Sequence, residues 1–446
     1  MLPSHHNNED NEEEEIAMKH KSLLIVSLLA AAFAAGGCAT QAPAVPAAQA
    51  QGATQPLVKG NWDAFNRGRI DALIAAYGKG SPAYDARKPP YAVFDWDNTS
   101  VFLDIEEAVL VYQLEQLRFG ATPQQLDTAI RVNIPGKDFN APFNNAAGQP
   151  VNIDKVAPDI IESYTWLYQN YRGLKGTQSL EQVKANPHYQ NFIAKMRYLY
   201  EAIGDSFDHA VAYPWVTYHF AGMTEAQVRQ LTADTVTWQL AQPIEKVKWT
   251  SPAALPGRAG VVSVSWKNGL RLVPEMQDLY GKMRNAGFDV WVCSASFVDV
   301  IKEISSNPAY GYNNAAERVL AMELERDAQG VIQPEFRRGY DQTQGKGKTK
   351  TIERFLVSRY GYGPAFVAGD SEGDQNMMQD FADTRAVLIV NRLRASDIGK
   401  LSGVAVQSYG KPDAKYLLQG RDDNKGLFVA SQQHTPLGAT QGKLLK

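Results

Sequence analysis

Three short apolar runs, each followed at once by polar residues, constrain the fold more than any other feature of this 446-residue sequence. The runs are residues 91–94, 288–293 and 364–368, and the polar residues that follow them include Asp95, Ser294 and Asp370. Bounded apolar runs of this length are typical of strands buried inside a parallel sheet. Because parallel strands present their carboxyl ends at one edge of the sheet, the loops there gather around one crevice. The sequence therefore predicts an α/β core with a ligand site at that edge.

The first polar segment, DWDNT at residues 95–99, carries two carboxylates that an extended chain points in the same direction. We expect Asp95 to attack phosphorus and form an aspartyl-phosphate, which splits one difficult hydrolysis into two easier steps. Asp97 is expected to protonate the leaving oxygen and then to accept a proton from the attacking water. Thr99 is expected to hold the turn and to hydrogen-bond nearby oxygens.

A calcium loop is the alternative interpretation of the same segment. Asp95, Asp97, Thr99 and Glu106 occupy positions one, three, five and twelve of such a loop. Position six needs glycine for a sharp turn but holds Ser100, and a strand instead of a helix precedes the segment. These departures disfavour calcium. Standing alone, the segment could also be a pair of surface aspartates.

Two further segments add groups that suit a phosphate. Ser294 follows a helix, a glycine and a strand in that order, and its hydroxyl can donate to a phosphoryl oxygen. The alternative role for this serine is to cap the next helix. The segment GKGKTKTIERFL offers Lys346, Lys348 and Lys350 ahead of a helix, although it could be a solvated basic loop. Lys348 lies one helical turn before the apolar Ile352, so we choose it as the cation that faces the phosphate.

The last polar segment, GDSEGD at residues 369–374, is an acidic strand end with glycines. Carboxylates of Asp95 and Asp370, with the main-chain carbonyl of Asp97, would supply the hard oxygen ligands that Mg²⁺ prefers. Asp374 would bind a metal water or orient Lys348. Taken alone, this segment could be only a surface turn.

Taken in order, these segments resemble the phosphatase form of the haloacid dehalogenase superfamily. The matching residues are Asp95, Asp97 and Thr99 as a DxDxT motif, then Ser294, Lys348, Asp370 and Asp374. The resemblance implies a doubly wound, Rossmannoid parallel-sheet core, Mg²⁺ as the cofactor, and hydrolysis of a small phosphomonoester.

A closer resemblance, spread over about residue 59 to the C-terminus, is to bacterial phosphorylcholine phosphatases. It is carried by the stretches DWDNTSVFLDIEEAVL, FAGMTEAQV, WKNGLRLVPEMQDL, VCSAS and LLQGRDDNKGLF. This family implies Mg²⁺-supported hydrolysis of phosphorylcholine and of other small phosphomonoesters. Trp96 departs from the family, in which we expect a methionine between the two aspartates.

A quaternary ammonium leaving group cannot be hydrogen-bonded, so aromatic faces and carboxylates must recognise it. Asp104, Glu106 and Glu107 follow the nucleophile and are candidates, although the two glutamates could equally be first-turn acids of a helix. Aromatic candidates crowd the segment between the first two motifs: Tyr164, Trp166, Tyr168, Tyr171, Tyr213, Trp215 and Tyr218. Aromatic residues at such spacings more often pack a helical core.

About 195 residues separate Thr99 from Ser294, far more than one crossover helix needs, so an inserted domain must lie between them. We assign residues 59–103 and 265–446 to the core, and 104–264 to a large, mainly helical cap that shields the intermediate from water. Expected cap helices are 104–119, 122–132, 160–170, 190–203 and 224–240, the last starting with a Thr224/Gln227 capping box. In the core, residues 319–336 predict a hairpin that turns near 327–330, and 386–390 predict the final strand.

The N-terminus predicts export. Residues 1–17 are acidic, which does not suit an export signal, whereas Met18 begins a segment with lysines, an apolar run at 23–35 and Gly-Gly-Cys at 36–38. We therefore expect a true start at Met18, a leader at 1–37, a lipidated Cys38 and a flexible tether over 38–58. Ala39 predicts an anchor in the bacterial outer membrane, with the catalytic domain in the periplasm. The apolar run is too short to span a bilayer comfortably.

The net charge and the cysteine content bear on the partners and on the disulfides that the chain can have. The formal net charge is −3, and neither a basic stripe nor a reading motif predicts a nucleic-acid partner. With Cys38 lipidated, Cys293 is the remaining cysteine, so no internal disulfide is possible. Three functions stay open: the favoured Mg²⁺-dependent phosphatase, a broad acid or phosphoserine-type phosphatase, and a lipoprotein that binds choline or phosphate without turnover.

Overall fold

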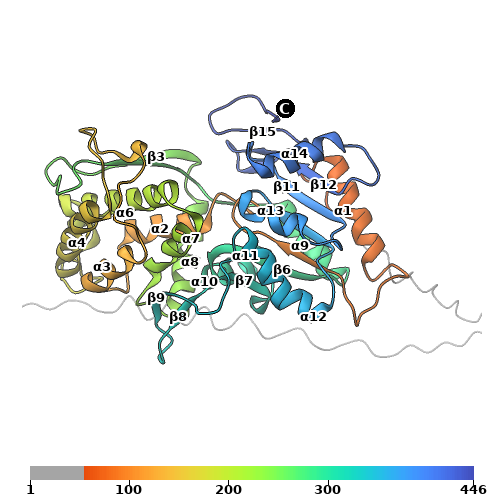
Figure 1. Ribbon diagram of the computed structural model, residues 1–446, viewed down its shortest axis with the longest axis horizontal. Coiled ribbons are helices and arrows are strands. Elements are labelled where there is room, and N and C mark those ends of the chain that lie inside the picture. The colour runs from red at the N-terminus through yellow and green to blue at the C-terminus, as the bar shows by residue number, and fades with distance from the viewer. Residues whose placement is uncertain (1–54, 446) are drawn as a thin grey trace, which may run out of the picture. The chain divides into compact units, whose positions relative to one another are not determined.

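The computed structural model describes residues 55–445, which all belong to one compact unit (Figure 1). The unit contains a six-stranded sheet in the order β12-β11-β10-β1-β6-β7, and every neighbouring pair of strands is parallel. The strands are β1 (Tyr91–Phe94), β6 (Asp289–Phe297), β7 (Val319–Met322), β10 (Phe366–Gly369), β11 (Ala386–Val390) and β12 (Tyr416–Gln419). The predicted doubly wound α/β core is confirmed. The leader, Cys38 and most of the predicted tether lie outside the described residues.

Helices bury both faces of the sheet. Successive residues of β1 alternate between two apolar clusters: Ala92 and Phe94 pack in one, Tyr91 and Val93 in the other. The first cluster includes α1 (Ala64–Tyr77), α9 (Pro274–Asn285) and α10 (Val298–Ser306), and the second includes α11 (Lys346–Ile352), α13 (Glu372–Gln379) and α14 (Asp397–Gln407). A strand buried on both faces has a continuous apolar run, which is why the sequence predicted these strands.

Two predictions about the core strands were wrong. Residues 319–336 do not form one hairpin, because β7 joins the central sheet in parallel with β6. The hairpin is shorter, with β8 (Leu324–Arg326) and β9 (Ile332–Phe336) on either side of the expected turn. Strand β11 is not the final core strand, because β12 pairs beyond it at the sheet edge. Periodicity alone does not distinguish a parallel edge strand from a hairpin arm.

The inserted segment, from residue 104 to about residue 268, contains mostly helices, drawn from orange through yellow to green in Figure 1. They are α2 (Ile105–Gln116), α3 (Pro123–Arg131), α4 (Ile153–Asn170), α5 (Leu180–Lys184), α6 (Pro187–Ser206), α7 (His209–Thr217) and α8 (Glu225–Leu240). The Thr224/Gln227 capping box of α8 is present as predicted. Helix α4 begins earlier than expected, with Pro158 in its second turn, where few backbone hydrogen bonds are lost.

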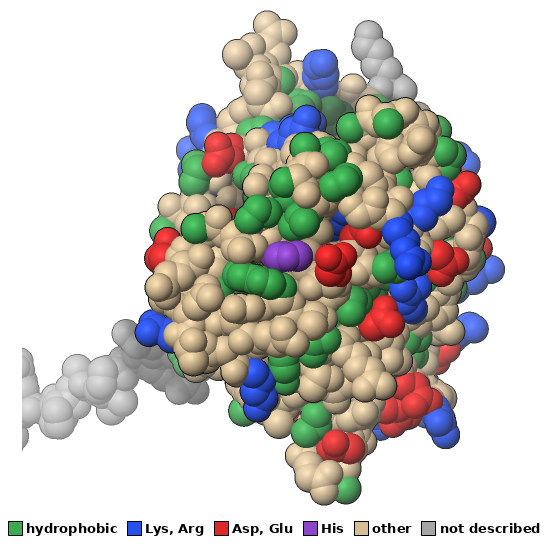
Figure 2. Space-filling model, turned by 90° about the vertical axis from the view of Figure 1, so that its left-hand side faces the viewer, with side chains coloured by type: hydrophobic (Ala, Val, Ile, Leu, Met, Phe, Trp, Pro, Cys, Tyr) green, Lys and Arg blue, Asp and Glu red, His purple; other side chains and the backbone are tan. Residues whose placement is uncertain are grey.

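This inserted segment also contains an antiparallel hairpin of β3 (Glu245–Thr250) and β4 (Ser263–Asn268), which the sequence did not predict. The domain boundary placed at residue 264 falls inside β4. Figure 2 shows one face of the segment, on which acidic and basic side chains are interspersed. Among the described residues, no helix is both long and apolar enough to cross a membrane.

Short strands complete the fold beside the site. Strand β2 (Val101–Phe102) pairs with β5 (Arg271–Leu272), and so connects the loop after β1 to the chain that leaves β4. Beyond β12, the chain forms a small sheet from β13 (Arg421–Asp422), β14 (Leu427–Phe428) and β15 (His434–Thr435). Both contribute to the surroundings of the site described next.

Candidate active site

A cavity of about 480 Å³ lies at the carboxyl edge of the sheet. The core contributes residues that follow β1, β10 and β11 and a residue near the end of β6: Asp95, Asp97, Asp370, Arg392 and Ser296. The inserted segment contributes aromatic and acidic side chains from α2, α6, α7 and β4. The cavity is therefore lined by the core and by the inserted segment together.

Lys348 lies at the centre of this site. Its Nζ is 2.6 Å from Oδ1 of Asp95 and 2.6 Å from Oδ1 of Asp374, and its side chain is 2 % exposed. Two alternatives considered for its role, Lys346 and Lys350, are exposed and do not line the cavity. Lys348 is the buried lysine of the three, on α11, which packs against β6 and α13.

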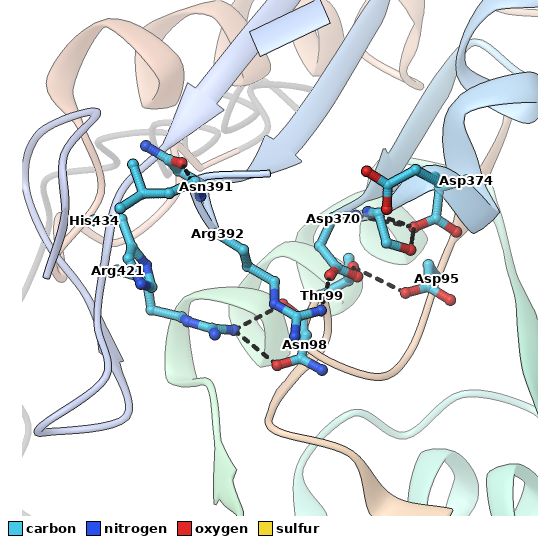
Figure 3. A network of polar contacts seen from close by, with 12 residues as sticks. Asp95, Asn98, Thr99, Asp370, Asp374, Asn391, Arg392, Arg421 and His434 are labelled. Carbon is cyan, nitrogen blue, oxygen red and sulfur yellow. Dashed lines mark hydrogen bonds and ion pairs between the residues drawn. The ribbon is translucent and has the colours of Figure 1, made fainter. Parts of the chain in front are cut away.

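The carboxylates around Lys348 are held from several sides. The Thr99 hydroxyl is 3.0 Å from Oδ2 of Asp95 and 3.1 Å from Oδ1 of Asp370 (Figure 3). Asp374 uses its second oxygen, Oδ2, to accept the backbone N–H groups of Asp370 and Ser371 at 3.0 and 3.1 Å. Thr99 therefore connects the nucleophile loop to the acidic strand end.

Burial and charge set the protonation of this group. Burial raises the pKa of Asp95 well above its usual value, and the nearby charge of Asp374 raises it further, while Lys348 lowers it. Burial alone would lower the pKa of Lys348, but Asp374 and Asp95 raise it well above its usual value. Lys348 therefore stays cationic and offsets the negative charge gathered around it.

The donor set fits a hard divalent cation. One oxygen from each of Asp95, Asp370 and Asp374 lies within 4.8 Å of the others, and all three residues are buried. Carboxylate oxygens at this spacing, beside a cavity that admits water and phosphate, match what Mg²⁺ requires. Because Oδ1 and Oδ2 of Asp374 already bind Lys348 and the backbone, this residue mainly orients Lys348.

Asp97 lies beside the nucleophile with both carboxyl oxygens engaged. Its Oδ1 accepts the backbone N–H of Ile105 at 2.7 Å, and its Oδ2 is 2.7 Å from the Ser296 hydroxyl. Burial raises the pKa of Asp97 well above its usual value, and the charges of Asp104 and Asp95 add to the rise. A carboxyl group whose pKa is raised holds its proton more tightly, which suits the predicted role of general acid.

The two serines of β6 are placed differently. Ser294 is fully buried, its Oγ accepts the backbone N–H of Ser296 at 3.1 Å, and it is not among the residues that line the cavity. Ser296 does line the cavity and contacts Asp97, a role that the sequence did not suggest. The preceding Cys293 is fully buried, and burial raises the pKa of its thiol to about 12.

Two arginines of the site were missed by the sequence reasoning. Arg392 follows β11 and places Nη1 2.5 Å from Oδ2 of Asp370 (Figure 3). Arg421 follows β12, is 2 % exposed, and donates from Nη1 to the nucleophile loop at Asn98. Asn391 separates Arg392 from the apolar run at 386–390, and Gln419 and Gly420 separate Arg421 from Leu418, so the pattern that predicted the other residues does not single out these two.

The three acids proposed to bind a cation take separate positions. Asp104 caps α2 by accepting the N–H of Glu107 at 3.0 Å, and burial raises its pKa to about 7. Glu106 is 2 % exposed and accepts the N–H of Phe297 at 2.5 Å, and burial raises its pKa to about 8. Glu107 pairs with Arg197 at 3.1 Å. All three line the cavity.

Of the seven aromatic candidates, the structure brings Tyr213 and Trp215 to the cavity. Tyr164 and Tyr218 are buried in the apolar core, and Trp166, Tyr168 and Tyr171 pack against it. The sequence reasoning missed Tyr200 of α6 and Trp266 of β4, which also line the cavity, together with Glu201. Aromatic residues of a cavity and of a core have the same periodicity, so spacing could not separate them.

Comparisons with known proteins were made by sequence and by structure. No protein-family model matches the chain. Over 262 residues, or 59 % of this chain, the sequence is 23 % identical to the phosphorylcholine phosphatase of Pseudomonas aeruginosa. The match includes 54 % of that protein, so the chain spans about half the length of the curated relative it matches.

Among solved structures, a conserved protein of unknown function from Anaerococcus prevotii DSM 20548 is 33 % identical, with a TM-score of 0.81. The superposition covers 85 % of this chain and 98 % of that one. A phosphoserine phosphohydrolase-like protein from Francisella tularensis is 11 % identical, covers 68 % of this chain and 87 % of its own, and has a TM-score of 0.30. The Anaerococcus protein therefore shares the fold of this chain over nearly its whole length.

Proposed function

We propose that the chain is a phosphatase of the haloacid dehalogenase type, a Mg²⁺-dependent phosphomonoesterase that works through an aspartyl-phosphate on Asp95, and the match to a phosphorylcholine phosphatase supports this proposal. The observation that carries the proposal is the buried contact of Lys348 with Asp95 and Asp374, next to Asp97, whose carboxyl group contacts the Ser296 hydroxyl and the Ile105 N–H. This arrangement combines a nucleophile, a fixed cation and a general acid at one edge of the sheet.

In the first half of the reaction, an Asp95 oxygen attacks phosphorus while the bond from phosphorus to the leaving oxygen breaks. Asp97 donates its proton to that oxygen, so the alcohol leaves neutral. Lys348 stabilises the charge of the phosphoryl group in the transition state. In the second half, Asp97 takes a proton from water, which attacks the phosphorus and releases phosphate and the free Asp95 carboxylate.

Asp95 and Asp370, with the main-chain carbonyl of Asp97, would hold Mg²⁺. When bound, the cation neutralises phosphoryl oxygens and orients them for in-line attack. Lys348 and Arg392 already offset part of the charge of the three carboxylates.

For the substrate, we propose phosphorylcholine or a similar small ester with a cationic leaving group. The support is the match to a phosphorylcholine phosphatase and the composition of the cavity wall. The wall combines acids with aromatic faces: Asp104, Glu107, Glu201, Tyr200, Tyr213, Trp215 and Trp266. Aromatic faces and carboxylates are what a quaternary ammonium requires.

Phosphate release from p-nitrophenyl phosphate, with and without EDTA, tests the reaction class. Asp95→Asn should lose turnover, and a turnover rate equal to that of the parent would exclude Asp95 as nucleophile. Choline and tetramethylammonium should inhibit competitively. Inhibition by serine alone would favour a phosphoserine-type enzyme, and no inhibition by either would favour a broad acid phosphatase. Choline binding without any phosphate release would identify a binding protein.

We also propose that the protein is exported and lipid-anchored through Cys38, in the outer membrane and facing the periplasm. The support is the leader-like segment from Met18 to Cys38, which lies outside the described residues. Fractionation of the parent and of Cys38→Ser tests this: the parent should fractionate with outer membranes and the variant with soluble periplasmic protein. Identical fractionation of both would overturn the anchor.

A further inference from the structure

The segment LLQGRDDNKGLF, which resembles the related phosphatases but has no role in the mechanism above, reaches the nucleophile loop. Arg421 of this segment donates from Nη1 to both the main-chain oxygen and Oδ1 of Asn98, each at 3.2 Å (Figure 3). Asn98 lies between Asp97 and Thr99 and has a φ of 59°, in the left-handed region that few non-glycine residues adopt. Arg421 thus binds the backbone at a residue of that loop with a left-handed conformation.

Burying the charged side chain of Arg421 beside the nucleophile loop costs free energy, because the guanidinium loses its contact with water. Its side chain is almost fully buried, and burial lowers its pKa to about 10, so it keeps its charge at neutral pH. Asp423 compensates the charge, since its Oδ1 accepts from Nε of Arg421 at 2.9 Å. The guanidinium also lies 4.9 Å from the centre of the Phe102 ring. A buried ion pair is weak evidence for stability alone, which favours a functional reason for it.

The second oxygen of Asp423 connects this pair to the inserted segment. Oδ2 of Asp423 accepts from Nζ of Lys267 at 2.8 Å. Lys267 belongs to β4 and, like its neighbour Trp266, lines the cavity. A continuous chain of polar contacts therefore runs from the cavity wall of the inserted segment through Asp423 and Arg421 to Asn98.

We propose that Arg421 is a positioning residue that fixes the nucleophile loop, and that Asp423 couples its position to Lys267 on the wall where the leaving group binds. The proposal rests on the proposed phosphatase function. Through this chain, a change at β4 alters how Asn98 presents the flanking carboxylates of Asp97 and Asp95. Arg421 also lines the cavity, and in this proposal it acts through its two contacts with Asn98.

Arg421→Lys tests the positioning role, because lysine keeps the charge but loses the fork that reaches Asn98 and Asp423 together. We expect kcat for p-nitrophenyl phosphate to fall about 100-fold with KM changed little, as a small misplacement of reacting groups would cause. Lys425→Met is the matched control, because Lys425 is exposed on the same segment and pairs loosely with Asp422 at 3.7 Å. Its kcat should equal that of the parent. A kcat in Arg421→Lys within twofold of the parent would overturn the role.

A double-mutant cycle of Lys267→Met and Asp423→Asn tests the coupling. Lys267→Met should lower kcat about fivefold in the parent and not at all in Asp423→Asn, because the route through Asp423 is already broken. Equal effects of Lys267→Met in both backgrounds would overturn the coupling.

Amide hydrogen exchange at residues 97–101 gives a readout that needs no turnover. Exchange there should be faster in Arg421→Lys and Asp423→Asn than in the parent, with thermal unfolding of all three proteins cooperative. Unchanged exchange would overturn the positioning role. A parent protein that releases no phosphate from any ester, but shows the expected exchange differences, would refute the proposed function and leave the positioning role standing.

Discussion

Asp97 is held by two donors that together decide where its proton sits. The Ile105 N–H is fixed on Oδ1, so the carboxyl proton belongs on Oδ2, beside the Ser296 hydroxyl. That hydroxyl can donate to the ionised form and accept from the protonated form, so it serves both halves of the reaction. Burial raises the pKa of Asp97, while the Ile105 N–H and the Ser296 hydroxyl, from two different segments, fix the orientation of its carboxyl group.

Asp97→Asn removes the proton donor while keeping the shape of the side chain. Hydrolysis of phosphorylcholine should fall by about 10²- to 10⁴-fold, because an alkoxide leaves poorly without a proton. For p-nitrophenyl phosphate, kcat/KM should fall much less, because p-nitrophenolate is a stable anion and kcat/KM reports only formation of the aspartyl-phosphate, before the shared step in which Asp97 activates water. Values of kcat/KM with both esters measure the difference, and equal losses would contradict the role of Asp97 as general acid.

Glu106 makes stability depend on pH in a direction that can be tested. Burial raises its folded pKa to about 8, so the folded protein holds a proton that the unfolded chain releases near pH 4.5. Its contribution to stability is therefore greatest below about pH 4.5 and is lost as pH rises through about 8. Glu106→Gln should remove this loss, so denaturant unfolding should show a larger gain over the parent at pH 9 than at pH 5. A gain independent of pH would contradict the raised pKa.

The helices and strands that the sequence predicted correctly are those whose signal lies within a few consecutive residues. Strand β1 coincides with the predicted run, because four consecutive buried residues identify a strand in a parallel sheet. The capping box of α8 was also predicted, because its two residues, Thr224 and Gln227, are only three positions apart. Strand β12 and the β3–β4 hairpin were missed, since their partners are distant in sequence or their faces are partly exposed. Arg392 and Arg421 were missed with them, because their importance depends on which strands lie beside β1.

The α8 capping box gives a prediction at this scale. In Thr224→Ala the N–H of Gln227 loses its side-chain acceptor, so the protein should lose about 1 kcal/mol of stability in denaturant unfolding. Thr237→Ala is the control, because Thr237 is exposed in the last turns of the same helix and alanine has the higher helix propensity. An equal loss in both variants would show that the cap contributes nothing.

For the whole molecule, the two parts of the cavity depend on each other. The sheet edge carries the nucleophile, the lysine and the carboxylates, while the inserted segment carries the aromatic and acidic wall. The sequence predicted the first part because strand ends define it. The second part lies on helix faces whose aromatic residues also fill the core, so its members could be assigned only once the fold was known.

Removing the metal from the whole molecule should abolish turnover without unfolding the protein. EDTA should abolish phosphate release but leave cooperative unfolding, because Lys348 and Arg392 already offset the buried carboxylates. Adding Mg²⁺ should raise the melting temperature, since a ligand that binds only the folded state stabilises it. Asp370→Asn should lose most of this shift. If the protein unfolds when EDTA is added, Lys348 and Arg392 do not offset the charge of the buried carboxylates as proposed.

The full burial of Cys293 makes the molecule convenient for spectroscopy. Its thiol is buried and burial raises its pKa to about 12, so maleimide reagents should not label it at neutral pH. With Cys38 replaced, a cysteine introduced at an exposed site such as Thr237 would be the single reactive thiol. A fluorophore attached there would report on movements of the inserted segment during turnover without any further engineering.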